Sequence, residues 1–301
     1  MGDEKFERKL IAYVDILGFE TLINESNKSQ LDNIVKKIKS MQALVTLESF
    51  VRIELVDDEN DNSSRDISAD EQSYPLCEIS TISDCMLITA PVTSEGATQL
   101  FNYLFELYRM AINEREGFSL VLRGGMVIGD ILHNGNLIIG TGYNKAVRLE
   151  KQAVNPIIVL DENFIEEKEI ETVIENYKNL YLKFDSKNMC WYFSPLTKTF
   201  KEGKDLLSLI KANDNSQCQI KPRNKFRVQL LRWRDMIQGE LLKHKNNSSI
   251  YDKWLFLALE FNLGLREIED RDTLKINGIE EIRIKRISKF YAWWKRLSLW
   301  V

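Results

Sequence analysis

The sequence predicts an α/β fold in which helices lie on one side of an antiparallel sheet, followed by a helical C-terminal extension. Two observations support this prediction. Segments typical of strands and helices alternate over the first 200 residues in the order strand, helix, strand, strand, helix, strand. Beyond about residue 200 the strand signals fade, and the remaining segments are typical of helices. We therefore expect one unit over residues 1–200 and a helical unit over residues 201–301.

The first strand and the first helix follow from the spacing of the apolar residues. Residues 9–19 form an apolar run with one acid inside it, Asp15, which predicts a buried strand. Residues 31–47 place apolar side chains at steps of three and four, which predicts a helix with one apolar face. Residues 57–71 hold seven acids and one arginine, so we expect a solvated loop before the next strand.

The centre of the chain continues this alternation. Residues 76–90 predict two strands joined by a tight turn at Ser83-Asp84. Residues 94–114 place apolar side chains on one side of a helix. The remaining predictions are strands over 119–128, 136–140 and 156–160, a hairpin connection over 129–135 and a short helix over 142–153.

The last third of the chain is predicted to be mainly helical. A final hairpin is expected over 178–183 and 189–195, and helices are expected over 203–212, 224–245, 250–264 and 278–298. Residues 275–301 carry seven Lys or Arg and two Glu, a charge of 7 − 2 = +5, mixed with aromatic residues. This composition suits a helix on a membrane surface or a helix packed on the protein, and we favour packing.

Composition excludes several classes of protein. With 44% hydrophobic and 29% charged residues, the chain of 301 residues is an ordinary globular sequence. Its net charge of −4 provides no basic field, so we expect no nucleic-acid partner. The four cysteines have no CxxC spacing and there are two histidines, which argues against a zinc site or a disulfide framework. No segment is typical of a signal peptide or a membrane span, so a cytoplasmic location is expected.

Two acids stand where acids are unusual. Asp15 lies inside an apolar strand, where a carboxylate is costly to bury without a cation. Asp84 lies at the tip of the predicted hairpin. Because the first strand is expected beside this hairpin, the two carboxylates can meet at one end of the sheet and bind Mg²⁺ or Mn²⁺. The alternative is that both acids cap the backbone at a strand end and a turn.

The predicted helix 142–153 supplies a second pair of polar residues. Asn144 and Arg148 are four residues apart and so project from one helix face. An amide and a guanidinium suit a ribose oxygen and a phosphate. The alternative is a polar surface helix in which Arg148 pairs with Glu150 or Asp161.

Four separate segments carry a family resemblance. They are AYVDILGF at 12–19, ISDCMLI at 82–88, LRGGMVIGDI at 122–131 and GTGYNKAVRLEKQA at 140–153. In this order the chain resembles the class III nucleotidyl cyclases over roughly residues 8–195. The resemblance implies a ferredoxin-like core, a head-to-tail homodimer with sites shared between the two chains, and cyclisation of a nucleoside triphosphate with two divalent cations, Mn²⁺ or Mg²⁺.

The resemblance also assigns roles to individual residues. Asp15 and Asp84 match the metal-binding acids, and the backbone carbonyl of Ile16 matches a further metal contact. Asn144 matches the residue that orients the ribose, and Arg148 matches the one that stabilises the transition state.

Two lysines and two base-facing positions complete the predicted site. Lys183 and Lys187, near the last hairpin turn, are candidates for binding the terminal phosphates, with ordinary surface solubility as the alternative. Ser80 and Leu137 match the positions at which purine cyclases recognise the base, and neither side chain reproduces a purine code.

The opening VDILGF and these divergent base positions are most similar to the pyrimidine cyclases of bacterial Pycsar antiphage systems. This similarity implies conversion of UTP or CTP to cyclic UMP or cyclic CMP, a messenger that activates a separate effector. An adenylate or guanylate cyclase and an inactive cyclase fold used as a regulatory module are the alternatives.

Overall fold

The protein is seen in a computed structural model that describes residues 5–43, 76–112, 119–135, 137–185, 188–194, 196, 200, 216–265 and 274–277. The strands are β1 (Glu7–Ile16), β2 (Glu78–Ile82), β3 (Cys85–Pro91), β4 (Leu122–Asn134), β5 (Leu137–Ile139), β6 (Ile158–Leu160), β7 (Leu182–Asp185) and β8 (Cys190–Phe193). The α-helices are α1 (Phe19–Glu25), α2 (Lys28–Ala43), α3 (Ser94–Ile112), α4 (Thr141–Gln152), α5 (Glu162–Ile165), α6 (Glu171–Leu180), α8 (Ser216–Lys243) and α9 (Ser248–Gly264), and Lys168–Ile170 form a 3₁₀ helix.

The sheet has a mixed α/β topology, as the sequence predicted. Within the described residues its order is β2-β3-β1-β4-β6-β8-β7, and β5 pairs with β4. The first four strands are all antiparallel, with β1 between β3 and β4. Together with α2 and α3 they have the order and connectivity of a ferredoxin-like βαββαβ unit. Strand β6 then extends the sheet parallel to β4.

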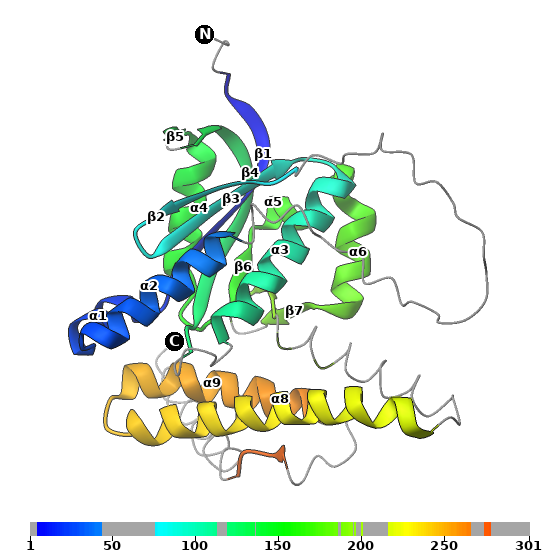
Figure 1. Cartoon of the computed structure of the whole chain (residues 1–301). Helices are drawn as coiled ribbons and strands as arrows, with labels where there is room; N and C mark the ends of the chain where they lie inside the picture. Colours follow the sequence, from blue (N-terminus) through cyan, green and yellow to red (C-terminus); the bar gives the residue numbers. More distant parts are fainter. Residues whose placement is uncertain are drawn as a thin grey trace, which may run out of the picture.

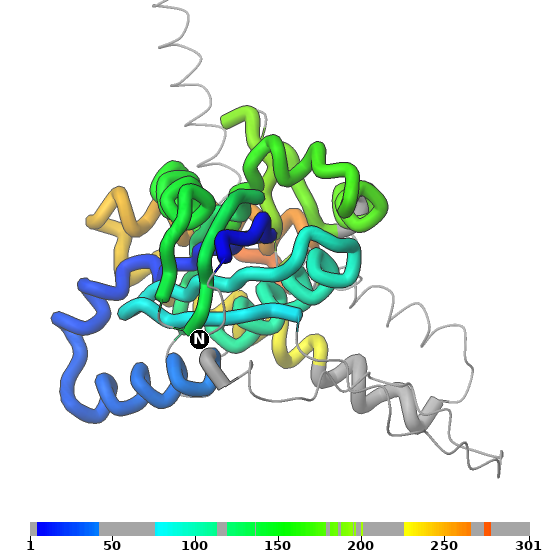
Figure 2. Tube along the Cα trace, turned by 90° about the horizontal axis from the view of Figure 1, so that it is seen from above, coloured from blue at the N-terminus to red at the C-terminus, as the bar shows by residue number. Residues whose placement is uncertain are grey.

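Helices cover both faces of the sheet, so the prediction of helices on one side is wrong. Alternate residues of a strand point to opposite faces. On β1, Leu10 and Val14 belong to the core shared with α3, whereas Ile11 belongs to the core shared with Ala146 of α4. Figures 1 and 2 show α4 on the opposite side of the sheet from α3 and α6.

Glycines on β4 let α4 approach the sheet closely. A Cβ atom at Gly125 would lie 2.8 Å from the carbonyl oxygen of Ala146, and one at Gly129 would lie 2.7 Å from the Cα of Gly142. Real Cβ atoms do not come this close to backbone. The two glycines therefore fix how near α4 lies to β4 and β1.

The helical hairpin α8–α9 packs below the sheet in the view of Figure 1. Trp233 of α8 and Leu257 of α9 are buried in the same apolar core as α3 and β1. On α9, Phe256 contacts the ring of Tyr192 edge-on, with the ring centroids 6.4 Å apart. The hairpin thus contacts the sheet through one shared core, while the division into units at residue 200 stays a prediction.

Two predicted boundaries are wrong. Strand β4 continues to Asn134 through the predicted hairpin connection 129–135, and the chain turns only at Gly135. Residues 171–180, part of which was predicted as strand, form helix α6, because Val173, Ile174 and Tyr177 give it a buried helical face. The sequence also missed α1, α5 and the 3₁₀ helix.

Several predicted segments lie outside the described residues. These are the acidic loop 57–71 and the helices 203–212 and 278–298. The predicted helices 224–245 and 250–264 are confirmed as α8 and α9. Among the described residues, none of the helices combines the length and the apolar character required to cross a membrane.

Candidate active site

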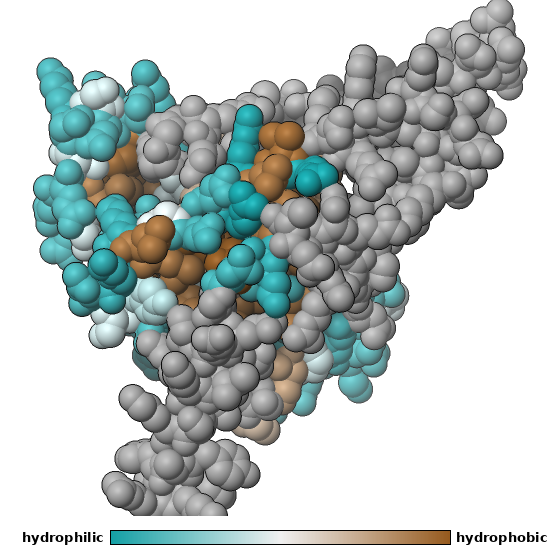
Figure 3. Space-filling model, turned by 90° about the horizontal axis from the view of Figure 1, so that it is seen from below, coloured by the Kyte–Doolittle hydropathy of each residue, from teal (hydrophilic) through white to brown (hydrophobic). Residues whose placement is uncertain are grey.

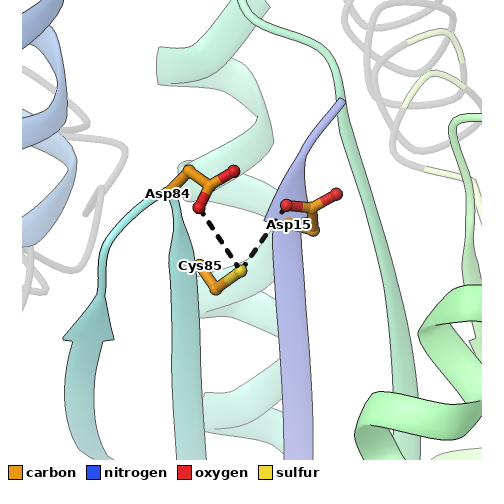
Figure 4. Close-up of side chains that lie close together, drawn as sticks. All are labelled: Asp15, Asp84 and Cys85. Carbon is orange, nitrogen blue, oxygen red and sulfur yellow. Dashed lines mark hydrogen bonds between the residues drawn. The ribbon is translucent and has the colours of Figure 1, made fainter. Parts of the chain in front are cut away.

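Asp15 and Asp84 lie together where β1 ends and β3 begins (Figure 4). Asp15 is the next-to-last residue of β1 and pairs with Cys85, the first residue of β3. The turn that carries Asp84 begins at Ser83, whose φ of 59° is left-handed. The backbone N–H of Ile16 donates to the carbonyl oxygen of Asp84, with N and O 3.3 Å apart, which fixes the turn against the end of β1.

Cys85 lies between the two acids. Ligand atoms of Asp15, Asp84 and Cys85 all lie within 4.8 Å of one another. The Cys85 thiol donates to Oδ1 of Asp15 over 3.5 Å. Burial raises the pKa of this thiol to about 12, so without a bound ion it is protonated at neutral pH and donates a hydrogen bond. The cluster also offers two carboxylates, the oxygen ligands that hard divalent cations prefer.

Arg123 of β4 and Glu150 of α4 extend the charged cluster into the protein. Nη2 of Arg123 lies 3.3 Å from Oδ2 of Asp15, and its Nε lies 2.5 Å from Oε1 of Glu150. The Arg123 N–H is not aligned on the Glu150 oxygen, so this contact is a charge pair without a hydrogen bond. The Glu150 side chain is 4% exposed. One guanidinium therefore serves two largely buried carboxylates.

The electrostatics of the cluster favour a bound cation. Burial raises the pKa of the Asp15 carboxyl; Arg123 lowers it and the negative charge of Asp84 raises it further. Burial also raises the pKa of Glu150, again opposed by Arg123. Among the described residues, the three carboxylates of this cluster outnumber the two cations, Arg123 and Lys253, that act on Asp15. Carboxylate oxygens in this arrangement fit Mg²⁺ or Mn²⁺.

Asn144 and Arg148 lie on the exposed face of α4. At about 100° per residue, Arg148 points roughly 200° away from Glu150, which faces Arg123. Glu150 pairs with Arg123, and Asp161 pairs with Lys145 at 2.7 Å, so neither acid pairs with Arg148. The side chains of Asn144 and Arg148 make no hydrogen bond or ion pair with another described residue. Within one chain these two residues are therefore directed away from the acids.

The two predicted base positions differ in their surroundings. The Ser80 hydroxyl donates to the carbonyl oxygen of Gly135 and lies 2.8 Å from Nε2 of His133, whose Nδ1 lies 2.8 Å from Oγ1 of Thr89. Leu137 follows this turn as the first residue of β5 and is 39% exposed. The fold thus brings Ser80 close to the turn that precedes Leu137, with the Ser80 hydroxyl already hydrogen-bonded inside the protein.

Lys183 lies away from the acids. It is on β7, at the end of the sheet and four strands from β1. Its Nζ lies 2.6 Å from Oε2 of Glu260 on α9. Glu260 is buried and also accepts from the hydroxyl of Ser194, with the two oxygens 3.1 Å apart. Lys187 lies outside the described residues.

Three residues of the site have no role that the sequence alone predicted. Arg123 and Glu150 stand inside two of the matching segments without an assigned role, and Cys85 was considered only for its cysteine spacing. A signal for Glu150 existed, because it stands four residues after Ala146 and eight after Gly142, on the apolar side of the helix. An acid at that position requires a buried cation.

Comparisons with known proteins give only remote similarities. No protein-family model matches the chain, and no curated protein matches it. A similar solved structure is the catalytic core of a rhodopsin-guanylyl cyclase with converted specificity in complex with ATPαS, at 13% identity, 62% coverage of this chain, 94% of that chain and a TM-score of 0.38. Another is an adenylate/guanylate cyclase/hydrolase from Silicibacter pomeroyi, at 16% sequence identity and a TM-score of 0.39. The match covers 64% of this chain and 98% of that chain. Because these similarities are weak, the activity has to be inferred from the residues of the site.

Proposed function

We propose that the protein is a nucleotide cyclase that converts UTP or CTP to the 3′,5′-cyclic monophosphate and pyrophosphate. The observation that carries this proposal is the convergence of Asp15 and Asp84 at the ends of adjacent strands in a ferredoxin-like sheet. The two carboxylates and the Ile16 carbonyl would hold two divalent cations. Bound there, the cations would acidify the ribose 3′-hydroxyl and neutralise the charge of the triphosphate.

Arg148 and Asn144 would act from a second copy of the chain. Both side chains are exposed and directed away from their own acids, which supports a homodimer with each site shared between two chains. Asn144 would orient the ribose so that O3′ faces the α-phosphorus. The new P–O bond forms as the bond to pyrophosphate breaks, and Arg148 would stabilise the charge that develops on the phosphoryl oxygens.

Base selection would depend on the absence of free hydrogen-bonding groups at the two predicted base positions. Leu137 offers no hydrogen bond to a base edge, and the Ser80 hydroxyl is already used by His133 and Gly135. A purine would leave its polar edge unpaired at these positions, and each such loss costs about 1–3 kcal/mol. The missing purine code and the resemblance to pyrimidine cyclases together support UTP or CTP over ATP or GTP.

The experiment is competition among equal concentrations of ATP, GTP, UTP and CTP with Mn²⁺ or Mg²⁺, analysed by mass spectrometry of the cyclic products. We expect cyclic UMP or cyclic CMP to dominate. Dominant cyclic AMP or cyclic GMP would leave a purine cyclase instead. Nucleotide binding without any cyclic product would indicate a regulatory module.

The product would act as a messenger in the cytoplasm, where nucleoside triphosphates are available, and in antiphage defence it would activate a separate effector. An infection assay tests this role in cells that carry the gene with its neighbours. Phage protection that persists in the Asp84→Asn variant would contradict it.

A further inference from the structure

A cavity lies between the hairpin α8–α9 and the residues that directly follow β1, the strand that carries Asp15. Its volume is about 490 Å³, within the range of small-molecule sites. On the sheet side it is lined by Leu17 and Gly18, which follow β1, and by Ser119–Val121, which precede β4. On the other side it is lined by residues of both helices, including Lys243, Lys253 and Trp254. Figure 3 views this side of the molecule, where hydrophilic residues border an apolar patch.

Lys253 connects this cavity with the acids. It lines the cavity, and its ammonium interacts electrostatically with both Asp15 and Arg123. It makes no ion pair with another described residue. Burial and the positive charge of Arg123 lower the pKa of Lys253, whereas Asp15 raises it. An anion bound nearby would favour the charged ammonium.

Helix α9 is held in this position at both ends of its buried face. Trp254 and Leu257 pack into the core beside the cavity. Two turns after Lys253, Glu260 accepts from Lys183 and Ser194 at the far strands of the sheet. The same helix therefore binds the ammonium of Lys183 and places Lys253 in the wall of the cavity.

We infer that Lys253 binds the polyphosphate tail of the nucleotide, so that α9 forms one wall of the active site. This inference rests on the proposed function. When the ribose lies beside Asp15 and Asp84, the phosphates of the nucleotide extend either toward solvent or into this cavity. Lys253 is the lysine of the cavity that also interacts with Asp15, so it is placed to neutralise a tail whose first phosphate lies at the acids.

The test compares Lys253→Met with the control Lys245→Met. Lys245 is exposed in the turn between α8 and α9 and does not line the cavity. The probe is inorganic tripolyphosphate with Mg²⁺, titrated by calorimetry, and the KM and kcat for UTP and CTP are measured in parallel. We expect Lys253→Met to weaken tripolyphosphate binding about 10- to 100-fold and to raise KM more than it lowers kcat. Lys245→Met should match the wild type, and Lys253→Arg should recover most of the loss.

The outcomes separate this inference from the proposed function. Unchanged tripolyphosphate affinity in Lys253→Met, or an equal loss in Lys245→Met, would overturn it even if the wild type forms cyclic nucleotides. A loss confined to Lys253→Met would support it even if the wild type forms no cyclic product. If thermal unfolding shows that Lys253→Met does not fold, Lys253→Gln, which keeps a polar end, is measured against the same control.

Discussion

The two faces of α4 differ in what they contact. The inner face carries Gly142, Ala146 and Glu150, all buried against β4 and β1. Glu150 is joined through Arg123 to Asp15. The outer face carries Asn144 and Arg148, which are exposed and make no contact of this kind with described residues.

This difference separates residues that stabilise the folded chain from residues that we propose act in the active site of a second copy. Charges on the inner face are balanced within the protein, and changing one leaves another buried without a partner. Charges on the outer face are solvated, so changing them costs the free chain little. Stability and activity should therefore respond differently to substitutions only two residues apart.

The largest effect is expected at the acids. Asp15→Asn and Asp84→Asn should each reduce cyclisation by about a thousandfold or more, because each removes a carboxylate from the cation site. Both proteins should stay folded, since the amide has nearly the shape of the carboxylate. Product formation is measured with Mg²⁺ and with Mn²⁺, and thermal unfolding checks the fold. A variant with near-wild-type turnover would refute the assigned cation site.

The next largest effect distinguishes the two arginines. Arg123→Met should lower the free energy of unfolding by about 3 kcal/mol, because Asp15 and Glu150 lose their shared cation while still largely buried. Arg148→Met should change it by less than about 0.5 kcal/mol and still lose activity. Urea unfolding followed by circular dichroism measures both. Equal destabilisation by the two variants would contradict the separation of the two faces.

The sequence was sufficient for the parts of the site that local patterns define. Asp15 in an apolar strand and Asp84 at a hairpin tip predicted two neighbouring carboxylates, because β1 lies beside the hairpin in a βαββ arrangement. Helical spacing placed Asn144 and Arg148 on one face of α4, whereas their roles in the site came from the family resemblance and stay predictions. The positions of these residues needed only strand order and helix periodicity, but their interpretation as one site also needed the resemblance.

The remaining features depend on contacts that the sequence does not reveal locally. Gly129 looked like part of a hairpin connection, but it belongs to β4, where the absence of a side chain admits Gly142 of α4. Lys253 stands more than 200 residues after Asp15, and only the packing of α9 under the sheet brings them together. A sequence pattern carries no information on such a contact without the fold.

A smaller effect is expected from complementation, which tests directly whether the acids and Arg148 act from different chains. The inactive variants Asp15→Asn and Arg148→Met are mixed and allowed to exchange subunits. If each site uses the acids of one chain and the arginine of the other, a mixed dimer holds one intact site and one doubly altered site. With random exchange, half of the dimers are mixed, so activity should return to about a quarter of the wild-type value. Confirmed exchange with no recovered activity would mean that the two faces of α4 serve the same chain.

The smallest effect concerns His133 of β4, whose ring nitrogens lie 2.8 Å from the hydroxyls of Ser80 and Thr89. Burial lowers the pKa of His133, opposed by Glu78, whose Oε2 lies 3.9 Å from Nδ1, and assisted by Lys9. A lowered pKa in the folded state means that the unfolded chain takes up the proton first. The stabilising effect of neutral His133 is therefore complete above its unfolded pKa of about 6.5 and is lost as the pH falls below it.

The loss is at most about 1.4 kcal/mol per pH unit, and His133→Gln should remove this component while keeping a hydrogen-bonding group near Ser80. Unfolding free energies are measured for both proteins between pH 7.5 and 5, over about 2.5 pH units. The difference between the two curves reports His133 together with its interaction with Glu78, and parallel curves would show that this histidine contributes no pH dependence.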